Sequence, residues 1–95
     1  MPAVTRKGDN NTGHDACPAV PLITSSSNVF ANGKCVGCLG DTYQSHGCIA
    51  HASHSGHISS GSSKVFVNGK PIARVGDSVS CGGSVAQGSP NVIAG

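Results

Sequence analysis

Apolar residues occur along this chain in short runs that Ser, Gly, Asn and Pro interrupt. The clearest runs are Val29-Phe30 and Val65-Phe66-Val67, and both consist of β-branched and aromatic residues, which favour strands. Asn32-Gly33 and Asn68-Gly69 follow them, and Asn-Gly predicts a β-hairpin because a type I′ turn needs positive φ at both central residues. No window of a dozen residues keeps an uninterrupted 3.6-residue apolar period. The pattern therefore predicts an all-β fold of short hairpins with little helix.

The pattern of apolar and polar positions occurs twice in nearly the same letters. Residues 26–41 and 62–77 align with an offset of 36 positions (62 minus 26), and they share SSxVFxNGK followed by a Gly-Asp pair. Residues 89–95 match the first part of this unit, and residues 4–9 match its last part. Such repeats are single supersecondary units that pack on their neighbours. We therefore expect one domain over residues 1–95, built from three strand-and-hairpin units around a pseudo-threefold axis.

The composition indicates that this fold needs more than a hydrophobic core. The chain has 95 residues, of which 37% are hydrophobic and 3% aromatic, and small domains with thin cores usually need a disulfide, a metal or a partner. The five cysteines cannot all pair with one another. Without a signal segment, reduced thiols or metal ligands fit the sequence better than a disulfide framework. A contact or disulfide between Cys17 and Cys48 stays open.

Charge and hydropathy exclude several classes of protein. The formal net charge is +2, and the six Lys and Arg residues are scattered, with none between Cys35 and Ser63, so a nucleic-acid footprint is absent. The start, MPAVTRKGDNN, lacks the apolar segment of a signal peptide, and no apolar run approaches the length of a membrane span. We expect neither a signal peptide nor a transmembrane segment.

Each Gly-Asp pair is followed, four or five residues later, by one potential metal ligand. These residues are His14, His46 and Cys81. If the three units surround an axis, the three side chains converge on it. Zinc takes His nitrogen and Cys sulfur in tetrahedral geometry, and a fourth protein ligand closes a structural site. The segment HASHSGH offers three candidates for that position, which are His51, His54 and His57.

A zinc-finger interpretation competes with this site. Cys35-x2-Cys38-x12-His51-x5-His57 has the spacing of a two-Cys, two-His zinc finger, which would make the chain a nucleic-acid-binding module. Such a finger needs a helix leading into its histidines. Residues 40–50 contain no helical stripe and no Lys or Arg. We therefore expect Cys35 and Cys38 to be small buried or half-buried residues.

An enzyme is the other competing interpretation. A zinc site with an open position could activate water for hydrolysis, and Cys48 could act as a nucleophile beside His46 or His51. Three of the four acidic residues belong to the Gly-Asp pairs, which leaves Asp15 as the one spare general base. The sequence favours a closed structural site and no catalysis.

At these residues the chain resembles the PAAR-repeat family. The resemblance rests on the Gly-Asp pairs with a following His, on SSKVFVNGKPIARVGD (residues 62–77), on Cys81-Gly82 and on GSPNV near the end. The motif's namesake Pro-Ala-Ala-Arg stands here as Pro71-Ile72-Ala73-Arg74, whereas residues 34–38 (KCVGC) depart from it. The resemblance covers essentially the whole chain and is loosest between residues 47 and 57.

The resemblance implies a compact, cone-shaped β fold with one zinc near the apex, held by three His and one Cys. Carried over by position, the ligands are His14, His46, His54 and Cys81. In the second loop the resemblance favours His54, because it stands seven residues before Gly61 of the Gly-Ser turn, where family members usually have the histidine. His51 and His57 stay open.

The resemblance also implies a role in contractile injection machines, which are contractile phage tails and type VI secretion systems. Family members cap a trimeric β-helical spike, either a VgrG-like protein or a phage central spike, with one chain per trimer. We expect a non-enzymatic tip that sharpens the spike, contacts the target membrane transiently and helps to pierce the cell envelope. The chain would then be part of a virion or be secreted through a type VI system, and the sequence fits both.

Overall fold

The structure is a computed structural model that describes residues 1–13, 18–48, 51–80 and 82–95, with residues 46–48 and 51–54 described by their backbone. Within these ranges the regular elements are short strands that pair as antiparallel hairpins, and no helix occurs. The strands are β1 (Phe30–Ala31), β2 (Lys34–Cys35), β3 (His46–Cys48), β4 (His51–His54), β5 (Phe66–Val67) and β6 (Lys70–Pro71). The prediction of a small all-β fold made of hairpins is confirmed.

Two of these hairpins are built on the Asn-Gly turns that the sequence predicts. Asn32 and Asn68 have φ values of 56° and 53°, and the glycines after them have 76° and 81°. Positive φ at both central residues is the signature of a type I′ turn. The turns set equivalent registers, with Phe30 opposite Cys35 in β1–β2 and Phe66 opposite Pro71 in β5–β6.

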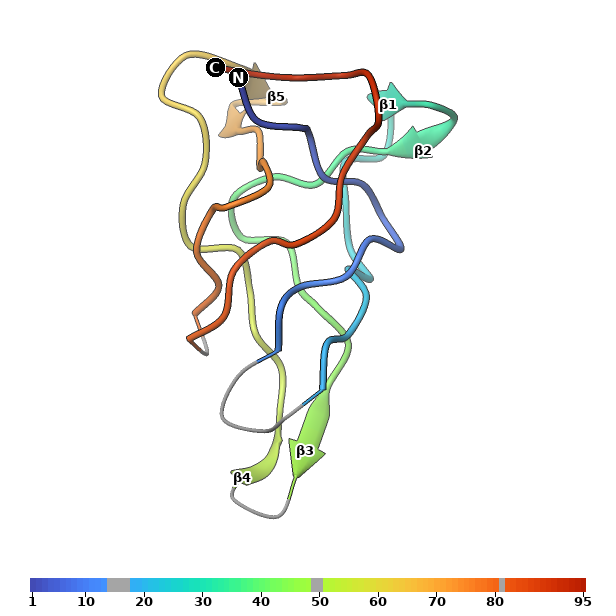
Figure 1. Cartoon of the computed structure of the whole chain (residues 1–95). Coiled ribbons are helices and arrows are strands. Elements are labelled where there is room, and N and C mark those ends of the chain that lie inside the picture. The colour runs from blue at the N-terminus through green and yellow to red at the C-terminus, as the bar shows by residue number, and fades with distance from the viewer. Residues whose placement is uncertain (14–17, 49–50, 81) are drawn as a thin grey trace.

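The two ends of the chain pair with one another beside these hairpins, as Figure 1 shows by the adjacent N and C labels. Ala3 forms an antiparallel bridge with Ile93. The N–H of Val4 donates to the carbonyl of Val92 at 2.9 Å, and the N–H of Ala94 donates to the carbonyl of Pro2 at 3.1 Å. The first and last residues are therefore the two arms of one antiparallel pair.

Three segments that are distant in sequence form a closed ring of backbone hydrogen bonds in the interior. Gly37 N–H donates to the Thr5 carbonyl at 3.0 Å, Ala73 N–H to the Gly37 carbonyl at 2.9 Å, and Thr5 N–H to the Ala73 carbonyl at 3.1 Å. The ring has no room for a side chain at its glycine, because a Cβ there would lie 2.6 Å from Leu22 Cδ2. Packing, and not turn geometry, therefore demands glycine at position 37.

Each Gly-Asp pair closes a tight turn of the same geometry. The glycines have φ values of 94°, 91° and 96°, a region that disfavours side chains, and they are Gly8, Gly40 and Gly76. The aspartate N–H donates to the carbonyl three residues earlier at 2.9–3.0 Å, and the carboxylate accepts the N–H of that same residue at 2.7–3.0 Å. The pairs are Asp9 with Arg6, Asp41 with Cys38, and Asp77 with Arg74. The short aspartate side chain thus satisfies a backbone donor inside its own turn.

The core is thin and divides into two clusters. The cluster next to the paired chain ends consists of Val4, Ala31, Val36, Cys38, Val67, Ile72 and Ala94. The second cluster consists of Val20, Leu22, Tyr43, Ile58, Ala73, Val79 and Val85. Tyr43 is fully buried, and its hydroxyl has no hydrogen-bond partner within the described part of the chain.

The molecule is elongated, with principal-axis extents of 37, 24 and 21 Å. In Figure 1 the chain ends and the strands β1, β2 and β5 lie at one end, and the β3–β4 hairpin lies alone at the other. Strand β4 places His51–His54 in a hairpin arm, where the sequence had suggested a loop. In the ranges that the structure describes, no helix is long and apolar enough to cross a membrane.

Candidate metal centre

The β3–β4 hairpin brings two of the four predicted ligand positions together. His46 is the direct backbone partner of His54 in the antiparallel register, and Cys48 is the partner of His51 after a register irregularity. Directly opposed residues of an antiparallel pair have Cα atoms about 4.5–5.5 Å apart. Of the three histidines that the sequence left open, His54 is therefore the one at the position opposite His46.

His57 lies outside this hairpin, but it is hydrogen-bonded to the residue that precedes the predicted ligand Cys81. It is exposed, and it bridges Thr42 in the backbone. Its N–H donates to Ser80 Oγ at 3.0 Å, and its carbonyl accepts the Ser80 N–H at 2.8 Å. Ser80 is the residue before Cys81, so His57 keeps a place among the candidates for the fourth ligand.

His14 and Cys81 lie outside the described residues, but the segments that flank them are hydrogen-bonded to each other. Thr12 N–H donates to the Ser84 carbonyl at 2.9 Å, and Ser84 N–H donates to Thr12 Oγ1 at 3.0 Å. A Cβ on Gly83 would lie 3.0 Å from the Gly13 carbonyl oxygen. The residues just before position 14 and just after position 81 therefore pack directly on one another.

Among the side chains that the structure describes, His, Cys and Asp do not gather in a group of three. The four predicted ligands are not among those side chains, so the predicted zinc and its ligand set stay predictions. The Cys17–Cys48 contact also falls outside the described side chains.

Cys35 and Cys38 are free thiols, one half-buried and one buried, as the sequence predicts. The pKa of the Cys38 thiol is raised to about 11, chiefly by burial and next by the nearby Asp41 carboxylate, while Lys70 acts in the lowering direction. A zinc finger would need a helix before His51, but the residues before His51 that the structure describes form β3. The structure therefore favours the structural role of both cysteines.

Large apolar side chains are exposed at the end of the molecule that lies opposite to the β3–β4 hairpin, near the paired chain ends. Phe30 is 59% exposed, Phe66 57% and Ile93 52%. We call these three residues the base patch. Phe30 and Phe66 hold the same register position in their hairpins, and Ile93 lies in the arm that pairs with Ala3. The sequence did not reveal this patch, because a Val-Phe pair indicates a strand without showing which of its faces is covered.

A comparison with family models finds that residues 50–95, nearly half of the chain, match the PAAR motif. The chain carries a PAAR motif. The match confirms the resemblance to the PAAR-repeat family, and the PAAR motif is that of the spike-tip family of contractile injection systems. No curated protein sequence matches the chain. The matched PAAR region begins after β3 and contains the β5–β6 hairpin with Pro71–Arg74, whereas the departing copy at residues 34–38 lies outside it.

Proposed function

We propose that this PAAR-motif chain is a structural tip that caps the trimeric β-helical spike of a contractile injection machine, either a phage tail or a type VI secretion system. The observation that carries the proposal is the PAAR motif over residues 50–95. The chain would act in the virion or after secretion through the type VI system. The following features of the fold support this role.

A cap on a trimer needs three comparable contact units, and we infer a pseudo-threefold arrangement in a tapering body. The closed ring of three backbone hydrogen bonds and the three Gly-Asp turns support it. Antiparallel bridges also run in a cycle between the units. They are Arg6 with Val36, Cys38 with Ile72, and Arg74 with Val4. Three units in one chain would let a single copy face all three subunits of the spike.

The base patch is the proposed contact with the spike. A trimeric β-helix ends in unpaired strand edges, which are prone to aggregate unless another chain covers them. Strands added from the chain's own hairpins can pair with such edges, and apolar side chains between them give the contact its specificity. Burying one Phe, Leu or Ile side chain contributes about 1.5–3 kcal/mol. Three base-patch residues would then supply one anchor per spike subunit, with one chain per trimer.

The proposed zinc site lies toward the end of the molecule that carries the β3–β4 hairpin, with His14, His46, His54 and Cys81 as ligands of one ion. The donor set suits zinc, because imidazole nitrogen and thiolate sulfur are its usual ligands in structural sites. The backbone register of His46 opposite His54 and the contact between residues 12–13 and 83–84 support the grouping. When bound, zinc supplies on the order of 10 kcal/mol of binding coupled to folding. It would tie together segments that no hydrophobic core can hold.

A closed four-ligand site leaves no position for a reactive water, so the proposed role includes no catalysis. The tip would act mechanically: it sharpens the spike, meets the target membrane transiently and helps the spike to pass through the envelope. Nucleic acid has no place in this role.

Elemental analysis of the purified chain tests the zinc site. We expect one zinc per chain in the wild type and in the Cys35→Ala control, and no zinc in His46→Ala and Cys81→Ala. Zinc that survives both ligand changes but leaves with Cys35→Ala would contradict the site.

Capping is tested by mixing the chain with the trimeric spike protein of the same machine and measuring the complex by native mass spectrometry. We expect one chain per trimer. Phe66→Ser should weaken the complex while zinc content stays at one per chain, whereas Ile23→Ser, which changes another exposed apolar residue, serves as the control. A complex that does not depend on the base patch, or no complex at all, would contradict the capping role.

A further inference from the structure

Two of the three Gly-Asp turns carry an arginine whose guanidinium group pairs with the aspartate of the turn. Arg6 Nε lies 2.9 Å from Asp9 Oδ2, and Arg6 Nη2 lies 3.2 Å from Asp9 Oδ1. Arg74 makes the same two contacts with Asp77, at 3.2 and 3.0 Å. Such two-point pairing matches the planar fork of a guanidinium to the two oxygens of a carboxylate. We call the space that each group fills a guanidinium slot.

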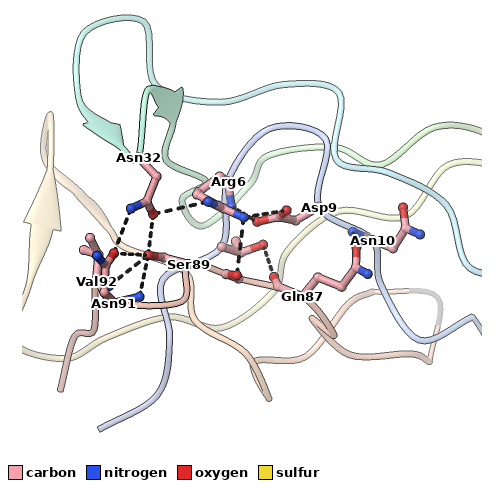
Figure 2. A network of polar contacts seen from close by, with 10 residues as sticks. Arg6, Asp9, Asn10, Asn32, Gln87, Ser89, Asn91 and Val92 are labelled. Atoms are coloured by element: carbon pink, nitrogen blue, oxygen red, sulfur yellow. Dashed lines mark hydrogen bonds and ion pairs between the residues drawn. The ribbon is translucent and has the colours of Figure 1, made fainter.

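Figure 2 shows what else surrounds the guanidinium of Arg6. Arg6 Nη1 donates to Asn32 Oδ1 at 3.2 Å, and Nη2 also donates to the Gly88 carbonyl at 3.4 Å. The slot of Arg6 is thus made of a turn aspartate, the asparagine of an Asn-Gly hairpin turn and a backbone carbonyl from the segment before Ser89. The arginine that fills the slot stands three residues before the aspartate.

In the third turn this position is Cys38, whose side chain is too short to fill a slot. The Asp41 carboxylate accepts the Cys38 N–H at 2.7 Å and the Thr24 hydroxyl at 3.1 Å, and within the described part of the chain it has no ion pair. A cavity of about 50 Å³ lies here. The residues that line it include Ser25, Ser26, Cys38, Asp41, Asn68 and Lys70.

The lining of this cavity corresponds to the slot of Arg6 position by position. Asp41 stands for Asp9 in its Gly-Asp turn, and Asn68 stands for Asn32 in its Asn-Gly turn. Asn68 Nδ2 donates to Asn28 Oδ1 at 2.9 Å, and its Oδ1 accepts no hydrogen bond from the described residues. The cavity therefore offers a carboxylate and an amide oxygen in the arrangement that holds Arg6.

We propose that the Cys38 cavity binds the guanidinium group of an arginine side chain that a partner protein supplies. Its volume of about 50 Å³ is several times the roughly 10–15 Å³ that one water molecule needs, so a small planar group fits. Guanidinium is favoured over an ammonium ion because its fork can reach two acceptors at once. Lys70 does not exclude a second cation, because Lys34 follows Asn32-Gly33 as Lys70 follows Asn68-Gly69, and Asn32 still accepts a hydrogen bond from the Arg6 guanidinium.

A protein partner fits better than a free metabolite because of where the cavity lies. Asn68 and Lys70 belong to the β5–β6 hairpin, which also carries the exposed Phe66 of the base patch. A protein surface that meets this hairpin can combine apolar contact with a charged anchor, and arginine is enriched among such anchors. Binding of an arginine side chain in this cavity would require no zinc.

The test is an NMR titration of the zinc-loaded, ¹⁵N-labelled chain with N-acetyl-arginine methylamide, and with N-acetyl-lysine methylamide as the control. We expect saturable shifts at the amides of Thr24, Cys38 and Asp41. The arginine derivative should bind roughly tenfold more tightly than the lysine derivative, as one additional charge-assisted hydrogen bond predicts. The titration of the wild type is decisive by itself: equal binding of both derivatives, or shifts that do not saturate, would overturn the proposal.

Two variants and one further ligand sharpen the result. Cys38→Arg should fill the cavity with the chain's own guanidinium, abolish binding and raise the melting temperature, whereas Cys38→Ser should keep binding. A Cys38→Arg chain that still binds the arginine derivative would contradict the proposal. Free L-arginine separates the two sources: binding of the free amino acid without binding of the blocked derivative would show a metabolite site and refute a protein side chain as the occupant.

Discussion

Replacing Gly37 by alanine tests whether the closed ring of backbone hydrogen bonds limits the packing of the interior. The added Cβ would lie 2.6 Å from Leu22 Cδ2, 3.0 Å from Thr5 Cγ2 and 3.6 Å from Ile58 Cδ1. The first distance is about 1 Å shorter than the roughly 3.5–4.0 Å optimum for two carbon atoms. Leu22 and Thr5 are 1% and 0% exposed, so neither can swing into solvent.

Overpacking of a dense core costs about 1–3 kcal/mol. Alanine also restricts the unfolded chain, which returns about 0.4–1 kcal/mol where the backbone tolerates it. We therefore expect Gly37→Ala to lower the free energy of unfolding by about 1–2 kcal/mol. For a chain of this size, that corresponds to a melting temperature lower by roughly 4–15 °C.

The assay is urea denaturation of the wild type and Gly37→Ala at equal zinc content, combined with Leu22→Ala in a double-mutant cycle. Because Leu22 supplies the shortest contact, the cost of Gly37→Ala should fall by about 1 kcal/mol in the Leu22→Ala background, within the range for touching residues. A stabilised Gly37→Ala variant, or a cycle without coupling, would refute the argument from packing.

Three further predictions concern Tyr43, the two described cysteines and the base patch. Tyr43→Phe should leave the free energy of unfolding unchanged or raise it by up to about 1–2 kcal/mol in urea denaturation, because it removes a buried hydroxyl without a partner among the described residues; a clear loss of stability would contradict this. Iodoacetamide at pH 8 should modify Cys35 well before Cys38, because Cys38 is 2% exposed and its pKa of about 11 leaves little thiolate; peptide mass spectrometry reads the order, and equal rates would refute it. Phe30→Ser combined with Phe66→Ser should change the melting temperature by no more than about 8 °C, since exposed positions contribute little to stability; a larger drop in calorimetry would mean that the base patch is part of the core.

Local turn chemistry made much of the fold predictable from sequence. Asn-Gly dictates a type I′ turn wherever apolar residues flank it, and both hairpins with this dipeptide form as expected. The two ends of the chain each match a part of the repeat unit, and in the structure Ala3 pairs with Ile93. These features depend on a few residues whose backbone preferences are strong.

Features that depend on tertiary contact were not predictable in the same way. Strand β4 consists of His, Ala and Ser, which have no strand preference of their own, and only its pairing with β3 makes it a strand. The sequence marked Cys38 as the residue in place of an arginine, but the cavity beside it depends on Asn68 and Ser25 from other segments. The predicted ligands His14 and Cys81 could be aligned by counting, but they lie outside the described residues, so their grouping into one site stays a prediction.

The closed ring has a consequence for how the chain must fold. Its three members are 32 and 36 positions apart (37 minus 5, and 73 minus 37), and Val4 must also find Val92. Such non-local contacts slow folding because long loops must close before any contact rewards them. During synthesis the first segment has to wait for the last one to leave the ribosome. Folding is therefore expected to be a single late event, and a chain cut between the two copies should leave two fragments that fold only together.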